Sequence, residues 1–229
     1  MDLNILKAGS IIPSVALALI PVTAHARPVE DTQLWTVLNV SGPIKGNIVF
    51  AADGRFQIVD GVSRRGQTLI RGSIGVKVRP NLTLSAGYVY SEIDRVGAPN
   101  SKENRAFQQV SWTIGPALGG TLSSRTRLEE RWFVGFPDTG WRLRQQLRLL
   151  APLSKTGASL ILQSELFIHL NSIAAGPRAG FDQLRTLVGL SLPVTKKVVI
   201  EVGYQPIYIK GATTDRLNHT IPVTLVIKL

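Results

Sequence analysis

Arginine recurs at every second position in two neighbouring segments of residues 119–150, and this spacing restricts what the chain can fold into. The positions between the arginines are mostly apolar. A side-chain period of two is that of a β-strand with one charged face and one apolar face. A helix would scatter the same arginines around its circumference. The arginines are Arg125, Arg127 and Arg131 in the first segment and Arg142, Arg144 and Arg148 in the second.

Two kinds of sheet accommodate strands of this type. A soluble sheet turns its charged face to water, whereas a membrane β-barrel turns its apolar face to lipid and its charges to the lumen. Along this chain, short turns alternate with longer polar connections, and Trp112, Trp132 and Trp141 lie in the apolar register near predicted strand ends. Short periplasmic turns, longer extracellular loops and aromatic girdles are typical of outer-membrane barrels.

Residues 1–26 have the features of a secretory signal peptide. Lys7 precedes an apolar stretch, and Ala24-His25-Ala26 is a cleavage motif with small residues at its first and third positions. We expect cleavage near Ala26 and one barrel domain over residues 27–229. No later segment has the roughly 20 consecutive apolar residues of a transmembrane helix, so a membrane crossing would use strands.

We therefore predict an all-β fold, an antiparallel transmembrane β-barrel of about 10–12 strands in the outer membrane of a Gram-negative bacterium. The alternative is a soluble periplasmic β-barrel that binds an anionic ligand. Single-chain bacterial barrels have an even number of strands. We expect twelve strands, with an additional short strand in residues 27–33. Ten would follow if residues 34–40 lay outside the ladder.

The inward register of such a barrel is rich in charge. Because buried charges need partners, one interpretation is a network of ion pairs that fills a small barrel, with Asp53 and Glu201 among the counter-charges. The other is a narrow, anion-preferring pore or binding barrel, since arginines outnumber carboxylates and rings of like charge select ions. The predicted lumenal, anion-facing residues are Arg55, Arg71, Arg125, Arg127, Glu129, Arg131, Arg142, Arg144, Arg148, Glu165 and Arg185.

The formal net charge of +11 suggests nucleic acid as a partner. The aromatic residues of the predicted strands, however, lie on the face opposite the arginines, whereas a platform for bases places both together. We expect no nucleic-acid partner; the expected partners are outer-membrane lipid and small anions or lipopolysaccharide. The chain has no cysteine and its three histidines are far apart, so we expect no metal and no cofactor.

His169 and Ser172 are the best candidates for catalysis, because a histidine and a serine together perform acyl transfer. A lipid-modifying acyl hydrolase of the outer membrane is therefore the alternative function. A continuous strand would place the two side chains on opposite faces, which favours a protein without enzymatic activity.

Several short motifs resemble a known family. They are Glu30-Asp31-Thr32-Gln33-Leu34-Trp35-Thr36 after the predicted signal, Arg55-Phe56, Arg127-Leu128-Glu129-Glu130-Arg131 and Trp141-Arg142-Leu143-Arg144. Over most of residues 27–229 the chain resembles the outer-membrane barrel family known as domain of unknown function (DUF) 2490. The resemblance implies an envelope barrel with no established activity and transfers no catalytic residue. Leu229 departs from the aromatic residue usual at the carboxyl terminus of such barrels.

Overall fold

The computed structural model describes residues 27–153 and 157–229, and the predicted signal peptide at residues 1–26 lies outside this range. The described residues form eleven strands and no helix, which confirms the all-β prediction. The strands are β1 (Val29–Lys45), β2 (Ile48–Val59), β3 (Arg64–Arg79), β4 (Leu82–Ile93), β5 (Ser101–Ala117), β6 (Gly120–Phe133), β7 (Thr139–Pro152), β8 (Ser159–His169), β9 (Gly180–Pro193), β10 (Val198–Ile209) and β11 (Arg216–Lys228).

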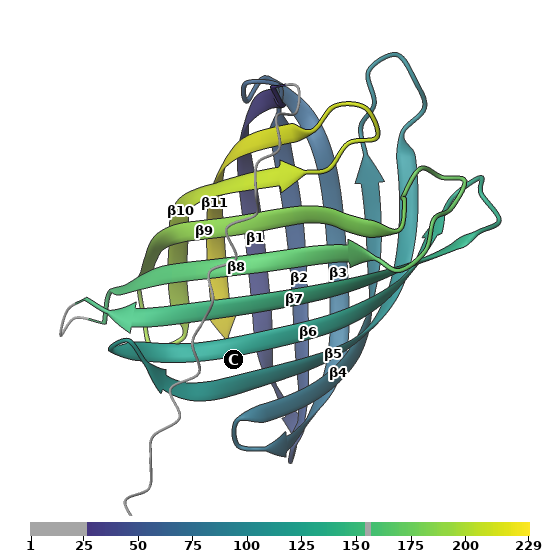
Figure 1. The fold of residues 1–229 in the computed structure, drawn as a ribbon. Coiled ribbons are helices and arrows are strands. Elements are labelled where there is room, and N and C mark those ends of the chain that lie inside the picture. The colour runs from purple at the N-terminus through teal and green to yellow at the C-terminus, as the bar shows by residue number, and fades with distance from the viewer. Residues whose placement is uncertain (1–26, 154–156) are drawn as a thin grey trace, which may run out of the picture.

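Strand β1 closes the sheet into a barrel by pairing with both β2 and β11 (Figure 1). All other neighbours are antiparallel, but β1 and β11 run parallel, in a register from Val29 opposite Arg216 to Ser41 opposite Lys228. An odd number of alternating strands requires this, because the first and last strands then point the same way. The expectation of twelve strands is therefore wrong for the described residues. Residues 34–40 are part of β1, and so are most of residues 27–33.

The connections fall into two classes at opposite ends of the barrel. At one end, here called the turn end, pairs of residues such as Gly46-Asn47 and Pro80-Asn81 join adjacent strands. At the other, the loop end, the connections are longer and include residues 94–100 and 170–179. Gly46 has a φ of 56°, in the left-handed region that glycine tolerates best, so a tight turn is accommodated there.

Two strands extend further toward the loop end than the sequence suggested. Residues 60–67 and 94–104 are polar and resemble connections in sequence, but β3 begins at Arg64 and β5 at Ser101. Polarity misled the prediction, because a strand that faces a polar interior carries polar side chains without leaving the sheet. Glu103 and Arg105 are consequently strand residues with inward-facing, buried side chains.

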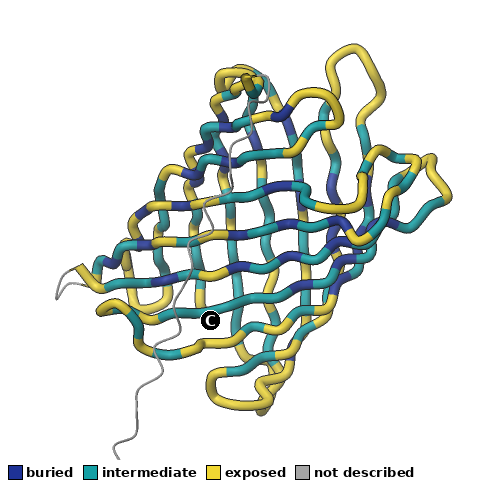
Figure 2. The backbone as a smooth tube through the Cα atoms, viewed as in Figure 1, coloured by how far each residue is buried: buried dark blue, intermediate teal, exposed yellow. Residues whose placement is uncertain are grey.

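Burial alternates along every strand and separates an inner from an outer face (Figure 2). The outer face is apolar and exposed, and Ile74 on β3 retains 62% of its accessible surface. The inner face combines charged side chains with a small apolar cluster of Leu69, Val89 and Phe107. The described part of the chain contains no helix with the length and hydropathy needed to cross a bilayer.

Candidate functional site in the barrel interior

The predicted charged residues all lie on the inner face of the wall. Most of them line two internal cavities, and Arg127 and Glu129 are buried between strands and other interior side chains. They come from six of the eleven strands, which the closed topology brings around one interior. The residues are Arg55, Arg71, Arg125, Arg127, Glu129, Arg131, Arg142, Arg144, Arg148, Glu165 and Arg185.

Glu129 on β6 has no exposed surface and holds the arginines of the neighbouring strand. Its carboxylate accepts hydrogen bonds from Arg142 at 2.6 Å and from Arg144 at 2.7 Å, and Arg127 lies 3.7 Å away. The register explains these contacts, because Glu129 is directly opposite Arg142 and Arg127 is directly opposite Arg144. Period-two alternation in both strands of the hairpin thus places a carboxylate among three guanidinium groups.

Arg144 links this group to a second buried carboxylate, Glu165 on β8. Glu165 accepts hydrogen bonds from Arg144 at 2.7 Å and from Arg125 at 2.9 Å. Nearer the turn end, Arg148 donates to Glu201 at 2.7 Å. Asp53 accepts a hydrogen bond from Arg71 on the opposite side of the barrel. Charge-assisted hydrogen bonds of this kind offset the cost of removing both ions from water.

A third group of ion pairs, near the loop end, was not predicted from the sequence. Glu103 accepts two hydrogen bonds of 2.8 Å from Arg105 and two more from Arg131. On β8 and β9, His169 Nε2 lies 3.3 Å from the Asp182 carboxylate, and His169 Nδ1 lies 3.4 Å from a guanidinium nitrogen of Arg131. Glu103 and Arg105 continue the odd-numbered inward register of Phe107 and Gln109, and that continuity was the signal available in the sequence.

Three aromatic residues of the described chain have buried rings that lie inside the barrel among the guanidinium groups. The guanidinium carbon of Arg127 lies 4.2 Å from the ring centroid of Phe107. Those of Arg144 and Arg185 lie 4.4 and 4.5 Å from the ring centroid of Phe167. The third ring, Trp35, contacts two arginines. The expectation that aromatic residues lie opposite the arginines therefore fails for these three residues, whose rings supply cation–π contacts in place of water.

Two of the cavities in the described interior share part of their lining. The loop-end cavity has a volume of about 1180 Å³ and is lined in part by residues of loops 60–63, 170–179 and 210–215. The turn-end cavity has a volume of about 520 Å³ and is lined by residues of all eleven strands. Five residues line both cavities and are called the central layer below. They are Trp35, Arg55, Arg105, Arg144 and Arg185.

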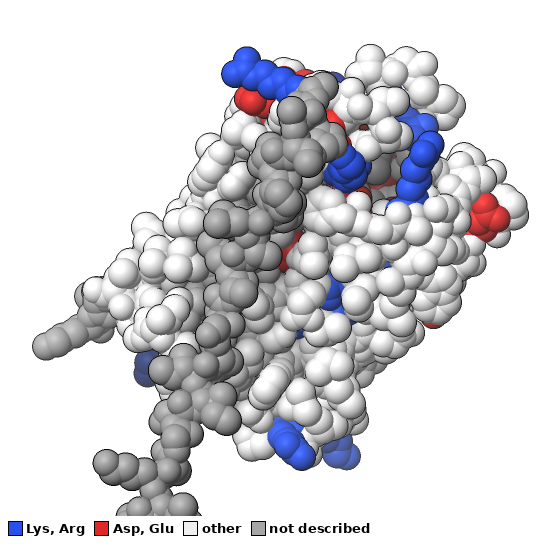
Figure 3. Space-filling model, viewed as in Figure 1, with Lys and Arg blue, Asp and Glu red and all other residues white. Residues whose placement is uncertain are grey.

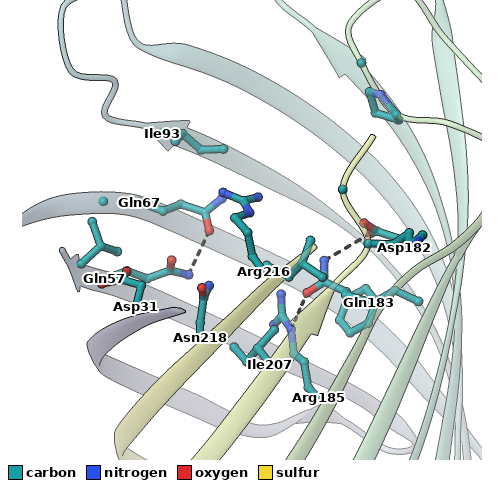
Figure 4. A pocket seen from close by; sticks show the side chains of 18 of the residues that line it. Asp31, Gln57, Gln67, Ile93, Asp182, Gln183, Arg185, Ile207, Arg216 and Asn218 are labelled. Atoms are coloured by element: carbon teal, nitrogen blue, oxygen red, sulfur yellow. Dashed lines mark hydrogen bonds between the residues drawn. The ribbon is translucent and has the colours of Figure 1, made fainter. Parts of the chain in front are cut away.

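Arg55 and Arg185 differ from the other arginines of the central layer. Their guanidinium carbons lie 4.6 and 5.2 Å from the Trp35 ring centroid. Arg185 Nε donates to Gln183 Oε1 at 2.9 Å (Figure 4), whereas Arg55 Nε is buried without a hydrogen-bond partner. Neither forms an ion pair with a carboxylate of the described residues, unlike Arg105 and Arg144. The floor of the loop-end cavity thus carries two guanidinium groups whose charge is not neutralised by direct contact.

The loop over residues 210–215 is fixed at the rim of this cavity by Asp215. The Asp215 carboxylate accepts hydrogen bonds from Tyr208, from Lys210 Nζ at 3.2 Å and from the Gly211 amide at 3.0 Å. The hydrogen bond from Tyr208, followed by the others, lowers the pKa of Asp215. The ionised carboxylate therefore holds the loop in place at neutral pH.

The structure does not bring the proposed hydrolase pair together. His169 is buried at the end of β8 with Asp182 and Arg131. Ser172 lies in the following loop, where its Oγ accepts a hydrogen bond from the Ala179 amide at 2.9 Å. His219 faces outward, and its Nδ1 lies 2.6 Å from the hydroxyl of Tyr204. Within the described ranges, no three side chains of the metal-binding types are grouped to hold an ion.

Replacement of Glu129 by glutamine tests whether the buried ion pairs hold the interior together. Glu129→Gln removes the counter-charge of three buried guanidinium groups with little change in shape. We expect the free energy of unfolding to fall by about 3–5 kcal/mol, the usual cost of breaking a buried pair. Urea unfolding of the refolded protein in lipid vesicles, followed by tryptophan fluorescence, measures the change.

Glu130→Gln is the matched control. Glu130 is the next residue on the same strand, points to the outer face and forms no ion pair among the described residues. Its replacement makes the same chemical change and should alter the free energy of unfolding by less than about 0.5 kcal/mol. Equal effects of the two substitutions would contradict a structural role for the Glu129 contacts.

Comparisons with known proteins show what this chain is similar to. The translocator domain of the autotransporter NalP from Neisseria meningitidis has a TM-score of 0.41 and 13% sequence identity, over 76% of this chain and 72% of that one. An uncharacterised protein of Methylorubrum extorquens is 38% identical over 196 residues, which are 85% of this chain and 86% of that protein. Residues 32–218 match the family model described as "Protein of unknown function (DUF2490)". The match confirms the resemblance seen in the sequence motifs, and the chain belongs to the DUF2490 family.

Proposed function

We propose that the chain is an outer-membrane β-barrel that is closed at its central layer and binds an anionic molecule in its loop-end cavity. The observation that carries this proposal is the pair of arginines without carboxylate partners, Arg55 and Arg185, at the floor of that cavity. Three features support the proposal: the apolar outer wall, the filled centre of the barrel and the interior arginines that have no carboxylate partner.

The outer wall supports insertion into a lipid bilayer. Large apolar side chains on every strand from β1 to β11 point outward, and Ile74, Tyr88 and Val188 are each more than half exposed. On the face seen in Figure 3, most of the wall is uncharged and the Lys, Arg, Asp and Glu side chains lie mainly toward its ends. Soluble monomers rarely expose apolar patches larger than a few hundred Å². An apolar exterior around a charged interior fits lipid outside and polar groups inside.

The filled centre favours binding over conduction. A conducting barrel requires a continuous aqueous path, whereas here Trp35, the paired Arg105 and Arg144, and the other members of the central layer line both cavities and occupy the region where the two meet. Ion pairs to Glu103, Glu129 and Glu165 anchor the arginines of this layer. Small barrels are commonly filled by side chains in this way.

The unpaired arginines favour an anion as the ligand. A guanidinium group that is removed from water without a counter-charge is costly, and a bound anion would supply the missing charge. Arginine binds carboxylate and phosphate through two parallel hydrogen bonds. Nearby paired arginines add a positive potential, because arginines outnumber carboxylates in the interior.

Substitution of an outward-facing residue tests the membrane location. Ile74→Arg should lower the free energy of unfolding in lipid vesicles by about 2–4 kcal/mol, because the charge would lie within the hydrocarbon layer. Val96→Arg is the control, since Val96 lies in loop 94–100 and is 77% exposed. Urea unfolding in phosphatidylcholine vesicles measures both. A barrel that stays in water would tolerate the two substitutions equally.

Calorimetric titration with inorganic phosphate tests the anion site. We expect saturable binding to the folded protein in detergent micelles. Arg185→Gln should weaken binding by about 10- to 100-fold, the effect of losing a charge-assisted hydrogen bond. Because Arg185 forms no ion pair with a carboxylate of the described residues, the substitution leaves no buried carboxylate without a partner. The barrel should therefore stay folded.

Arg95→Gln is the control for the phosphate titration. It removes the same charge from an exposed loop residue that does not line the cavity. Absence of phosphate binding by the folded wild-type protein, or equal loss of affinity in both variants, would overturn the anion site.

A further inference from the structure

We infer that the anion belongs to an acidic saccharide, whose charged group meets Arg55 and Arg185 while its hydroxyl groups meet a band of amide side chains above them. The inference rests on the anion site proposed for the loop-end cavity and goes further by naming the class of ligand. It depends on residues that the charge pattern of the sequence did not single out.

The amide band consists of carboxamide side chains that line the loop-end cavity on the side formed by β1, β2, β3, β9 and β11. Gln57, Gln183 and Asn218 are each buried in the wall, yet they border the cavity (Figure 4). Gln33 and Gln67 complete the band. Strands β3, β2, β1 and β11 are consecutive across the parallel closure of the barrel, and β9 follows after β10, so residues distant in sequence share one surface.

Carboxamides match sugar hydroxyl groups in hydrogen-bonding capacity. Each carboxamide offers two donors and an acceptor, and each hydroxyl group is both donor and acceptor. The band is ordered before any ligand binds: Gln57 Nε2 donates to Gln67 Oε1 at 2.9 Å, and Trp35 Nε1 donates to Gln33 Oε1 at 3.0 Å. The remaining donors and acceptors are thereby held in place, which reduces the entropy lost on binding.

Asn218 is the member of the band most available to a ligand. Its side chain forms no hydrogen bond with another described residue, and its polar atoms are not among the buried unsatisfied ones. The amide therefore reaches the solvent of the cavity. A hydroxyl group of a ligand would find both a donor and an acceptor there.

The amide band and the charged floor meet at Gln183. Gln183 accepts the hydrogen bond from Arg185, and its amide nitrogen donates to Asp182 at 3.2 Å. A ligand with its acidic group on Arg185 would therefore have its adjoining ring against the amides. The cavity volume of about 1180 Å³ is far larger than an inorganic ion needs and suits a ligand of several rings.

The polar lining also distinguishes a saccharide from an acyl chain. Sites for apolar ligands are lined mainly by hydrophobic and aromatic side chains. Here glutamines, an asparagine, arginines and carboxylates line the cavity together with apolar side chains that include Trp35, Phe167 and Ile207. An acyl chain would leave the amides without partners, at a cost for each buried polar group.

Calorimetric titrations with matched sugars and anions test the inference on the full chain in detergent micelles. In the phosphate arm, glucose 6-phosphate is compared with inorganic phosphate; in the carboxylate arm, trigalacturonate is compared with acetate. Maltotriose supplies hydroxyl groups without charge. We expect at least one acidic sugar to bind about tenfold more tightly than its sugar-free anion, the gain from one or two hydrogen bonds. Maltotriose should not bind measurably. The arm that shows the gain identifies the acidic group.

A pair of asparagine variants assigns the gain to the amide band. Asn218→Ala should remove most of the tenfold advantage of the acidic sugar while the affinity for inorganic phosphate stays the same. Asn39→Ala is the matched control. Asn39 faces inward from β1, the strand that adjoins β11, but it lines only the turn-end cavity and not the loop-end cavity. Both variants should retain the wild-type unfolding midpoint.

The outcomes separate this inference from the proposed function. Phosphate binding that depends on Arg185, with no advantage for either acidic sugar, would overturn the saccharide and leave the anion site standing. Maltotriose bound as tightly as trigalacturonate would also overturn it, since charge would then be irrelevant. Loss of all anion binding would remove the proposed function as well.

Discussion

The interior of this barrel depends on Glu129 and the arginines around it. A carboxylate with no exposed surface is stable only where it is fully paired, and Arg142 and Arg144 supply that pairing from the next strand. Arg144 extends the contacts to Glu165, so that two carboxylates and their arginines connect β6, β7 and β8 inside the wall. The large guanidinium groups fill part of the interior. The space that remains includes the loop-end and turn-end cavities, which meet at the central layer.

Charge pairing is unequal around the barrel, and the difference gives the interior two kinds of surface. Strands β5 to β9 carry most of the carboxylates and the arginines paired with them. Strands β1 to β3 and β11 contribute amides, Trp35 and the unpaired Arg55, and β9 adds Gln183 and the unpaired Arg185 to this side. The paired side supplies rigidity, and the amide side supplies hydrogen-bonding groups that are still available. Natural proteins depart from complete pairing mainly at functional sites, and the floor of the loop-end cavity is such a departure.

Much of this arrangement follows from the spacing of residues in the sequence. Period two assigns each strand residue to one of the two faces of a closed sheet, and on this basis Arg127, Glu129 and Arg142 share a face. Partners were harder to infer, since they depend on register, and a one-residue slip exchanges the faces. Glu103 was missed because a polar strand end cannot be told from a loop by composition. Periodicity also carries no information on strand direction, so the parallel pairing of β1 with β11 was not foreseen.

The most direct test of the account is the electrical conductance of the folded wild-type protein in a planar bilayer across a salt gradient, with insertion verified by protease protection in vesicles of the same lipid. A barrel closed by Trp35 and the paired arginines should give no steady current steps. Trp35→Ala combined with Phe167→Ala shortens two large interior side chains, one of them in the central layer, and should produce steps in the same bilayer. Steady, anion-selective steps from the wild-type protein would contradict the closed interior and favour a pore instead.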